Sequence, residues 1–388
     1  MERRKGPFPC FNLAQTPRLL LHPLSIYASI KNMTNLMIKK INSGLKFLLS
    51  DIHKRYHLNL VSDTLFKHMQ EFVLRKGKRI RPLLFLLAYK GYSRRTRINE
   101  KKLFASSAAI ELLHDFMLIH DDVIDNSDVR RGKPTLHRLF EKKIKINPKE
   151  AIGAKLAIVA GDILYAVAIE ALLSIDESPK RKEQALRQLV AAAAYTGAGE
   201  FLDVLSSLRP LEKMTQKDVF LNYTLKTARY TFECPLLMGA TLAGADQKEI
   251  RKLSSLGLAA GQAFQLYDDF LDLFGTEKII GKPILTDLNE SKKTLLVFKA
   301  YRRLGKKQKK LLILLLNKKN KKRSDLKVFR DLIVQSGSYQ DCQSTLERLQ
   351  RKATRLISEL KIRKREKDVL KNLITNISAS MPSFKISS

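Results

Sequence analysis

Cysteines, long apolar runs and acidic residues are all scarce in this sequence of 388 residues. The three cysteines, Cys10, Cys234 and Cys342, are far apart and match no metal-binding spacing. They provide no disulfide framework, which is typical of a reducing compartment such as the cytoplasm. No apolar run approaches the roughly 18 residues that a bilayer-spanning helix needs, so we predict no transmembrane segment.

The shortage of acidic residues leaves a strong positive charge. There are 38 acidic residues against 72 lysines and arginines, a formal net charge of +34. Polyanionic substrates, an anionic surface such as nucleic acid or membrane, or genomic drift toward lysine would each explain it. The lysines are densest in polar runs such as GKKQKK and NKKNKKRS, which have few aromatic neighbours. Single-stranded nucleic acids bind to interleaved aromatics, so we predict no nucleic-acid partner and attribute most of the excess to drift.

The first 32 residues differ from the rest of the chain. They contain four prolines and one acidic residue, Glu2, and they lack helical periodicity. A basic, acid-poor segment of this kind is either a disordered tail or a targeting sequence. We favour the tail, so residues 1–32 are predicted as a disordered extension and residues 33–380 as one folded domain.

From Met33 onward, apolar residues recur every three or four positions, as amphipathic helices require. No alternating strand pattern of useful length is present. A polar joint at 76–82, the sequence Gly-Lys-Pro at 132–134 and a loop at 275–289 interrupt the helices. The sequence therefore predicts an all-α, single-domain helical bundle around a central cavity, and bundle cores commonly hold metal sites. The long expected helices are 104–125, 151–173, 184–205, 220–243 and 253–274.

Two acidic clusters share one spacing and stand far apart in the sequence. On a helix, the first and last aspartate of each cluster point to the same side. Grouped carboxylates repel one another unless a cation is present, and Mg²⁺ binds through carboxylates, waters and substrate phosphates. Solvated acidic helix ends are the alternative, but the flanking residues are apolar. We expect one magnesium site built from two halves, with the ligands Asp121, Asp122, Asp125, Asp268, Asp269 and Asp272.

Four motifs together resemble those of the trans-isoprenyl diphosphate synthases, the polyprenyl synthetases that make farnesyl, geranylgeranyl and longer diphosphates. They are KGKRIRP at 76–82, DDVIDNSDVRRG from Asp121, the pair Lys226 and Thr227, and DDFLD from Asp268. The resemblance runs from about Met33 to the C-terminal helices. It implies a Mg²⁺-dependent, homodimeric enzyme that joins isopentenyl diphosphate head-to-tail to an allylic diphosphate.

The resemblance also assigns roles to basic and polar residues. The allylic diphosphate would be bound by Arg130, Lys226 and Lys282, and also by Lys292 from the loop. The allylic carbocation would be stabilised by Thr227 and Gln265. Isopentenyl diphosphate would occupy a metal-free pocket of Lys78, Arg81, His114 and Arg131. His114 lies seven residues before Asp121, so helix geometry places both on nearly the same side. An ordinary basic joint at 78–81 and a core amide at Gln265 remain the simpler alternatives.

Three positions depart from the family pattern. Lys76 and Leu285 stand where glycine is common, and Glu200 stands where glutamine is frequent. None of these positions belongs to the aspartate clusters or to the main phosphate-binding residues. The departures therefore bear on turnover and leave the implied reaction unchanged.

The length of the product depends on a bulky residue before the first aspartate cluster. Helix geometry points to Met117, four residues before Asp121, whereas the resemblance points to Phe116, about 7.5 Å along the axis. A lone aromatic at this position, without an insertion in the motif, resembles archaeal-type geranylgeranyl diphosphate synthases. We therefore predict a twenty-carbon product.

Several alternatives stay open at the level of the sequence. A farnesyl or longer product is one, and a non-catalytic subunit of a heteromeric synthase is another, although such subunits lose aspartates that this chain keeps. A class I terpene cyclase would share the first aspartate cluster. It would have no use for KGKRIRP or for the Arg-Arg-Gly sequence that follows the cluster.

Overall fold

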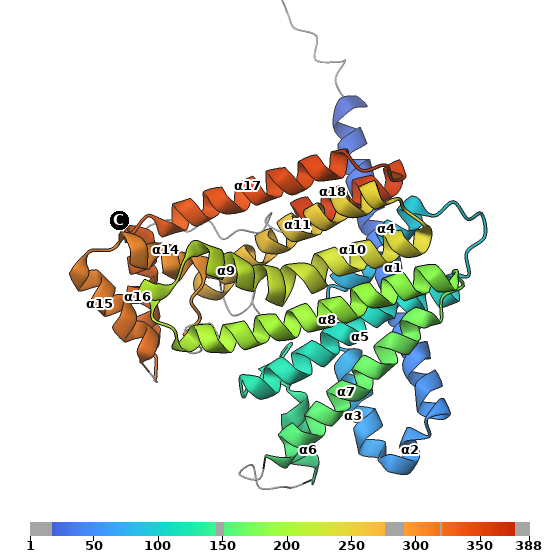
Figure 1. Ribbon diagram of the computed structural model, residues 1–388, viewed down its shortest axis with the longest axis horizontal. Coiled ribbons are helices and arrows are strands. Elements are labelled where there is room, and N and C mark those ends of the chain that lie inside the picture. Colours follow the sequence, from blue (N-terminus) through green and yellow to red (C-terminus); the bar gives the residue numbers. More distant parts are fainter. Residues whose placement is uncertain (1–17, 145–150, 276–290, 319, 377–388) are drawn as a thin grey trace, which may run out of the picture.

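The computed structural model describes residues 18–144, 151–275, 291–318 and 320–376, with the backbone alone for residues 18–31, 59 and 144. In these ranges the chain is almost entirely helical (Figure 1). One antiparallel pair of two-residue strands, β1 (Val129–Arg130) and β2 (Lys133–Pro134), is the whole of the sheet in the described part. The all-α prediction is confirmed.

Four helices form the N-terminal part. They are α1 (Arg18–Arg55), α2 (Leu58–Val61), α3 (Asp63–Val73) and α4 (Ile80–Tyr92). Helix α1 begins before the predicted boundary at residue 33, and residues 1–17 of the predicted extension lie outside the described residues. The expected polar joint separates α3 from α4, and nine residues of α4 are buried.

Helix α5 (Glu100–Ile124) is the central helix, as predicted. The side chain of Asn99 caps it by accepting a hydrogen bond from the Lys102 N–H. Its residues are buried on nearly every side because α1, α4 and α7 (Ile152–Leu173) pack around it. After α5 the chain turns through Arg131 and Gly132, whose φ values of 56° and 72° lie in the left-handed region. This turn directs Arg130 back toward the end of α5, and α6 (Leu136–Ile144) follows.

The predicted helix at 220–243 is continuous but changes its winding. It consists of α9 (Gln216–Asn222), the π-helix η3 (Tyr223–Glu233) and α10 (Cys234–Ala243). It follows α8 (Pro179–Leu208) and the short 3-10 helix η2 (Leu211–Lys213). Glycines allow α8 and α11 to approach this helix closely. A Cβ at Gly199 of α8 would lie 2.6 Å from the backbone nitrogen of Lys226, and a Cβ at Gly261 of α11 would lie 2.3 Å from the Ala228 Cα. Hydrophobic periodicity cannot distinguish a π-helix from an α-helix, and π segments often mark functional sites.

Helix α11 (Gln247–Phe274) connects two apolar cores. Its first half packs into a core with α4, α5, α7 and α10, and its second half packs into a core with the C-terminal helices. Figure 1 shows α17 running along α11, with α15 and α16 at one end of the molecule. The C-terminal helices are α14 (Leu295–Arg303), α15 (Lys306–Asn317), α16 (Arg323–Gln335), α17 (Ser338–Ser358) and α18 (Lys364–Thr375).

Two helices of the described chain are long and apolar enough to cross a membrane by length and composition alone. In α5, 78% of the apolar window is buried, so its composition is that of a core helix. In α7 only 44% of the window is buried. The outer side of α7 therefore needs another explanation.

Candidate functional site

The first aspartate cluster lies at the end of α5 and the second lies in the last two turns of α11. In each cluster the middle aspartate, Asp122 or Asp269, is buried. The outer aspartates, Asp121 with Asp125 and Asp268 with Asp272, are more open to solvent. The expected arrangement, in which two carboxylates per helix share an accessible side, is therefore present on both helices.

Arg130 contacts two carboxylates of the first cluster. Its Nε donates to Asp122 Oδ1 at 2.7 Å, and a terminal nitrogen donates to Asp121 Oδ2 at 3.0 Å. The left-handed turn at Arg131 makes this return possible. Burial raises the pKa of Asp122 to about 6, against the effect of Arg130. The other Asp122 oxygen is buried and has no hydrogen-bond partner among the described residues.

Lys226 of η3 sits between three carboxylates. Its Nζ is 3.5 Å from Asp121 Oδ1, 2.8 Å from Glu200 Oε2 and 2.7 Å from Asp203 Oδ2. Burial acts to raise the pKa of Asp121, but Lys226, Arg130 and Lys292 lower it below its ordinary value. Asp121 is thus held ionised. Glu200, noted in the sequence only as a departure, directly contacts a predicted site residue.

Thr227, the next residue of η3, is linked to the second cluster through Gln265. Its hydroxyl donates to Gln265 Oε1 at 2.5 Å, and Gln265 Nε2 donates to Asp269 Oδ1 at 3.0 Å. Tyr223 donates to the other oxygen of Asp269. Two residues of η3, Lys226 and Tyr223, therefore contact one aspartate of each acidic cluster, so this helix links the two predicted halves.

A second group of basic residues lies beside α5. A terminal nitrogen of Arg81 donates to the Tyr230 hydroxyl at 2.9 Å and to Thr231 Oγ1 at 2.8 Å, and the guanidinium lies 4.6 Å from the Tyr230 ring centroid. The Nδ1 atom of His114 is 3.5 Å from the same hydroxyl. Burial, with Arg81 and Arg131, holds the pKa of His114 well below its ordinary value. His114 is therefore neutral at physiological pH.

Two donors in this group are unsatisfied. The Nε of Arg81 and one terminal nitrogen of Arg131 are buried and have no hydrogen-bond partner within the described chain. The facing carboxyl of Asp115 is 3.8 Å from Arg131, and burial raises its pKa to about 8. Buried donors are normally hydrogen-bonded. The unpaired nitrogens of Arg81 and Arg131 are therefore available to an anion whose oxygens accept hydrogen bonds.

The remaining predicted phosphate-binding residues are less closely defined. Lys78 is exposed and follows Gly77, where a Cβ would lie 3.6 Å from the Arg131 guanidinium carbon. Lys292 is close enough to lower the pKa of Asp121. Lys282 and Leu285 lie outside the described residues.

Arg79, in the same motif as Lys78 and Arg81, is a structural residue. Its guanidinium donates to Glu111 of α5 at 2.6 Å and to the backbone carbonyls of Val73 and Arg75. It is 2% exposed, which leaves it no access to a ligand. Within the basic joint, Arg79 therefore binds α5, Arg81 contacts η3, and Lys78 is exposed to solvent.

The two candidate chain-length residues have different surroundings. Phe116 stacks on Tyr165 of α7, with ring centroids 5.1 Å apart, and meets the His120 ring at 4.5 Å. Met117 is also partly buried, against the first core. The partner ring of Tyr165 is a feature that sequence reasoning missed.

Four further residues of the site were not found from the sequence. They are Asp203, Tyr223, Tyr230 and Asp115. A helical-spacing signal exists for two of them, since Asp203 follows Glu200 by three residues and Tyr230 follows Lys226 by four. Their roles depend on contacts between helices, which spacing within one helix does not report.

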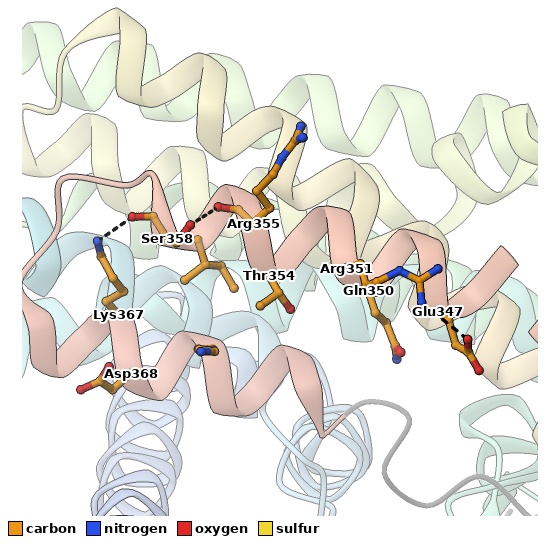
Figure 2. Close-up of a pocket in the computed structure, with 10 residues that line it drawn as sticks. Glu347, Gln350, Arg351, Thr354, Arg355, Ser358, Lys367 and Asp368 are labelled. Carbon is orange, nitrogen blue, oxygen red and sulfur yellow. Dashed lines mark hydrogen bonds and ion pairs between the residues drawn. The ribbon is translucent and has the colours of Figure 1, made fainter. Parts of the chain in front are cut away.

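A separate groove runs between α17 and α18 and contains none of the predicted site residues (Figure 2). Its charges are mixed: Arg351 lies 3.6 Å from Glu347, and Lys367 donates to the Ser358 carbonyl at 3.2 Å. Asp368 lies on the α18 side. The groove is therefore not the site that the sequence predicts.

The carboxylates fit a hard, phosphate-bridged cation better than a metal held by protein alone. In the described part of the chain, no three His, Cys, Asp or Glu side chains converge as a cage. Mg²⁺ is usually held by one or two carboxylates, several waters and substrate phosphates. Asp121 is ionised and lies close to basic side chains that would bind phosphate. It therefore fits this way of holding Mg²⁺.

Comparison with known proteins identifies the same family that the sequence motifs resemble. Residues 62–333 match the polyprenyl synthetase family. The chain is 32% identical over 278 residues to a short chain isoprenyl diphosphate synthase of Methanocaldococcus jannaschii, covering 71% of this chain and 78% of that protein. It is 32% identical to a geranylgeranyl diphosphate synthase of Saccharolobus solfataricus, covering 66% of this chain and 72% of the relative.

A solved structure resembles most of this chain. It is a geranylgeranyl pyrophosphate synthase from Corynebacterium glutamicum in complex with isoprenyl diphosphate and magnesium. The TM-score is 0.81 and the sequence identity is 26%, with 88% of this chain and 98% of that chain covered. Relatives at 31% identity include both a farnesyl and a geranylfarnesyl diphosphate synthase, so similarity alone does not choose one product.

Proposed function

Because this chain belongs to the polyprenyl synthetase family and is a prenyltransferase, we propose that it condenses isopentenyl diphosphate with an allylic diphosphate to form geranylgeranyl diphosphate. The observation that carries the proposal is the junction at η3. Lys226 contacts the first aspartate cluster, and Thr227 contacts the second through Gln265. One segment thus presents a cation and a hydroxyl to the same space between two acidic helix ends.

In this proposal the allylic diphosphate binds at the aspartates. Its negative charge meets Arg130 and Lys226 directly, with Lys292 nearby and Lys282 from the loop. Asp121, Asp125 and Asp268 would hold Mg²⁺, and Asp122, Asp269 and Asp272 would support them. Bound there, Mg²⁺ supplies positive charge that stabilises the leaving diphosphate as the allylic carbon–oxygen bond breaks.

The polar residues at the junction would face the allylic carbocation. Thr227 and Gln265 offer a hydroxyl and an amide oxygen, which are dipoles that stabilise positive charge without acting as strong nucleophiles. Asp269 holds the Gln265 amide through a hydrogen bond of 3.0 Å. We therefore assign Asp269 to orienting Gln265, because Gln265 and Tyr223 already donate to its two oxygens.

Isopentenyl diphosphate would bind in the basic group beside α5. The unsatisfied nitrogens of Arg81 and Arg131 would donate to its phosphate oxygens, with Lys78 at the exposed edge. Neutral His114 would donate one hydrogen bond and add no charge. This pocket would leave the double bond of isopentenyl diphosphate to attack the allylic carbon, after which a proton leaves.

The proposed twenty-carbon product rests on the aromatic pair of Phe116 and Tyr165. Stacking at 5.1 Å, and the close approach of α7 at Gly161, make this side of α5 compact. An elongating chain would meet these rings one turn beyond Asp121. Farnesyl and longer products remain the alternatives that the product assay separates.

We also propose that the enzyme is a cytoplasmic homodimer that pairs through α7 and α8. These helices pack together and expose apolar side chains that a second copy would cover. They are Ile158, Val159, Val190, Phe201, Val204, Leu205 and Leu208, with Leu208 78% and Phe201 69% exposed. Light scattering should report twice the monomer mass, and a dimer that survives Leu205→Glu with Leu208→Glu would contradict this interface.

The test of the proposed reaction is direct. The full chain is incubated with labelled isopentenyl diphosphate, Mg²⁺ and, separately, dimethylallyl, geranyl or farnesyl diphosphate, and the products are resolved by length. We expect geranylgeranyl diphosphate to accumulate from each primer. A product that stops at fifteen carbons would refute the assigned length, and no product from any primer would refute the function.

A further inference from the structure

Helix α15 carries an apolar surface that the second core does not use. Residues 311–316 are six consecutive aliphatic residues, LLILLL. Leu312, Leu315 and Leu316 are buried in the second core. On the other side, Leu311 is 40% exposed and Leu314 is 63% exposed. Exposed leucines that follow one another by three residues form a continuous apolar line on a helix.

Lysines surround this apolar line. From Lys306 to Lys318 the sequence has five lysines and no acidic residue. Lys306, Lys307 and Lys310 are exposed, whereas Lys318 forms an ion pair with Asp325 of α16 at 2.7 Å. Lys309 lies 5.0 Å from the Tyr301 ring centroid. The exposed positive charge therefore belongs to the first turns of α15, beside the exposed leucines.

These lysines do not stabilise the helix. The first turn of α15 contains no acidic residue, and positive charge at a helix N-terminus opposes the helix dipole. Folding stability alone would favour acidic side chains there. The positions of Lys306 and Lys307 are better explained by an external negative partner.

The surface is also hollowed. A shallow depression of about 610 Å³ is lined by Lys310, Ile313, Leu314, Asn317 and Lys318. The lining combines the aliphatic side chains of Ile313 and Leu314 with the ammonium group of exposed Lys310. An acyl chain with an anionic headgroup matches this arrangement, since the chain would contact the leucine and isoleucine while the phosphate meets an ammonium group.

The helix is close to the proposed active site. Ser291, next to Lys292, donates to the Leu316 carbonyl at the end of α15. Helix α14, which precedes α15, begins where the Leu295 N–H donates to the Tyr223 hydroxyl at 2.9 Å. Figure 1 shows α15 at the outer end of the molecule, beside α14 and α16. A surface that contacts α15 would thus lie near the site from which the product leaves.

We propose that the exposed side of α15, defined by Lys306, Lys307, Lys310, Leu311 and Leu314, docks the enzyme on an anionic phospholipid surface. The lysines would face the headgroups and the leucines would enter the headgroup boundary, as in interfacial amphipathic helices. Nucleic acid fits less well, because it would leave the leucines in water and the surface offers no aromatic rings for stacking. This inference goes beyond the proposed reaction and does not require the enzyme to be active.

The test is co-sedimentation of the full chain with vesicles. Pure phosphatidylcholine vesicles are compared with vesicles containing about one third phosphatidylserine at physiological salt. We expect binding to the anionic vesicles only. Changing Lys306, Lys307 and Lys310 to Gln should weaken binding by about 100-fold, since each basic residue near such a surface contributes roughly fivefold. Leu311→Gln with Leu314→Gln should weaken it by about tenfold.

Matched controls separate this helix from the overall charge. Changing the exposed residues Lys180, Lys248 and Lys352 to Gln removes the same charge elsewhere, and Leu60→Gln removes a leucine that is 80% exposed in α2. Neither control should change vesicle binding by more than about twofold. The proposal is overturned if the wild-type protein ignores anionic vesicles, if the lysine control weakens binding equally, or if duplex RNA competes while the leucine variant binds normally. The far-ultraviolet circular dichroism spectrum and the melting temperature serve as the folding check for each variant.

Discussion

Replacing Glu200 with glutamine should strengthen the binding of the allylic substrate. Glu200 and Asp203 hold Lys226 at 2.8 Å and 2.7 Å, whereas Asp121 lies 3.5 Å away. The ammonium group is therefore drawn toward α8 and away from Asp121, the proposed metal ligand. Burial raises the pKa of Glu200, with Lys226 opposing this effect. The change Glu200→Gln keeps the shape of the side chain and removes one competing charge.

The expected size follows from Coulomb's law. A diphosphate oxygen in contact with Lys226 would lie about 6 Å from the Glu200 carboxylate, and two unit charges at that distance repel by roughly 3 kcal/mol at an effective dielectric constant of about 20. Water and bound cations should offset about half of this energy. The remaining 1.4 kcal/mol, an order-of-magnitude value, corresponds to about tenfold in affinity.

The assay is steady-state kinetics with the allylic diphosphate varied at saturating isopentenyl diphosphate and Mg²⁺. We expect the KM for the allylic substrate and the inhibition constant of inorganic diphosphate to fall about tenfold, with the KM for isopentenyl diphosphate unchanged. Glu183→Gln is the matched control, because Glu183 lies on the same helix and, among the described residues, forms its ion pair with exposed Arg187. An unchanged or higher KM in Glu200→Gln would mean that Glu200 supports Lys226 and does not compete for it.

Three other predictions follow from the site. Phe116→Ala should remove the ring that stacks on α7 and shift products beyond twenty carbons, whereas Met117→Ala should do so less; the reverse order in a product assay would favour ideal helix geometry. Arg81→Ala should mainly raise the KM for isopentenyl diphosphate and Lys226→Ala that for the allylic substrate, and equal effects on both substrates would contradict two separate pockets. Because burial holds the pKa of His114 below its unfolded value of about 6.5, the unfolded chain binds that proton first. The contribution of His114 to the free energy of unfolding should be complete above about pH 6.5 and fall below it by up to about 1.4 kcal/mol per pH unit, while the raised pKa of buried Asp115 acts in the opposite direction. In denaturant titrations His114→Gln should reduce this slope, and an unchanged slope would show that another group causes it.

The sequence predicted the helices and the residues that share one helix face. Hydrophobic periodicity and the aspartate spacing depend on local geometry, which explains why α5 and α11 were placed correctly with their acidic ends. The same local rules could not predict the π-helix η3, because hydrophobic periodicity does not distinguish it from an α-helix, nor the close packing of glycines of α8 and α11 against it. They also could not show that Lys226 would contact the first aspartate cluster while Thr227 is linked to the second through Gln265.

Residues that act through contacts between helices were the ones missed. Asp203 and Tyr223 acquire their roles only when α8, η3 and α11 meet. The lysine runs were interpreted as drift, since their relation to the exposed leucines appears only once the buried side of α15 is known. Arg79 was not among the predicted ligand residues, and the structure shows it buried and hydrogen-bonded to Glu111.

The central claim is that two aspartate clusters form one catalytic site, and turnover of Asp121→Asn and Asp268→Asn tests it most directly. Each variant is compared with Asp331→Asn, an exposed aspartate on α16, in the presence of Mg²⁺ and both substrates. We predict that turnover falls about 1000-fold or more in each cluster variant, because ionisation of the allylic diphosphate loses its charge stabilisation, while helicity and the control activity stay unchanged. Near-normal turnover in either cluster variant would contradict a site built from both halves.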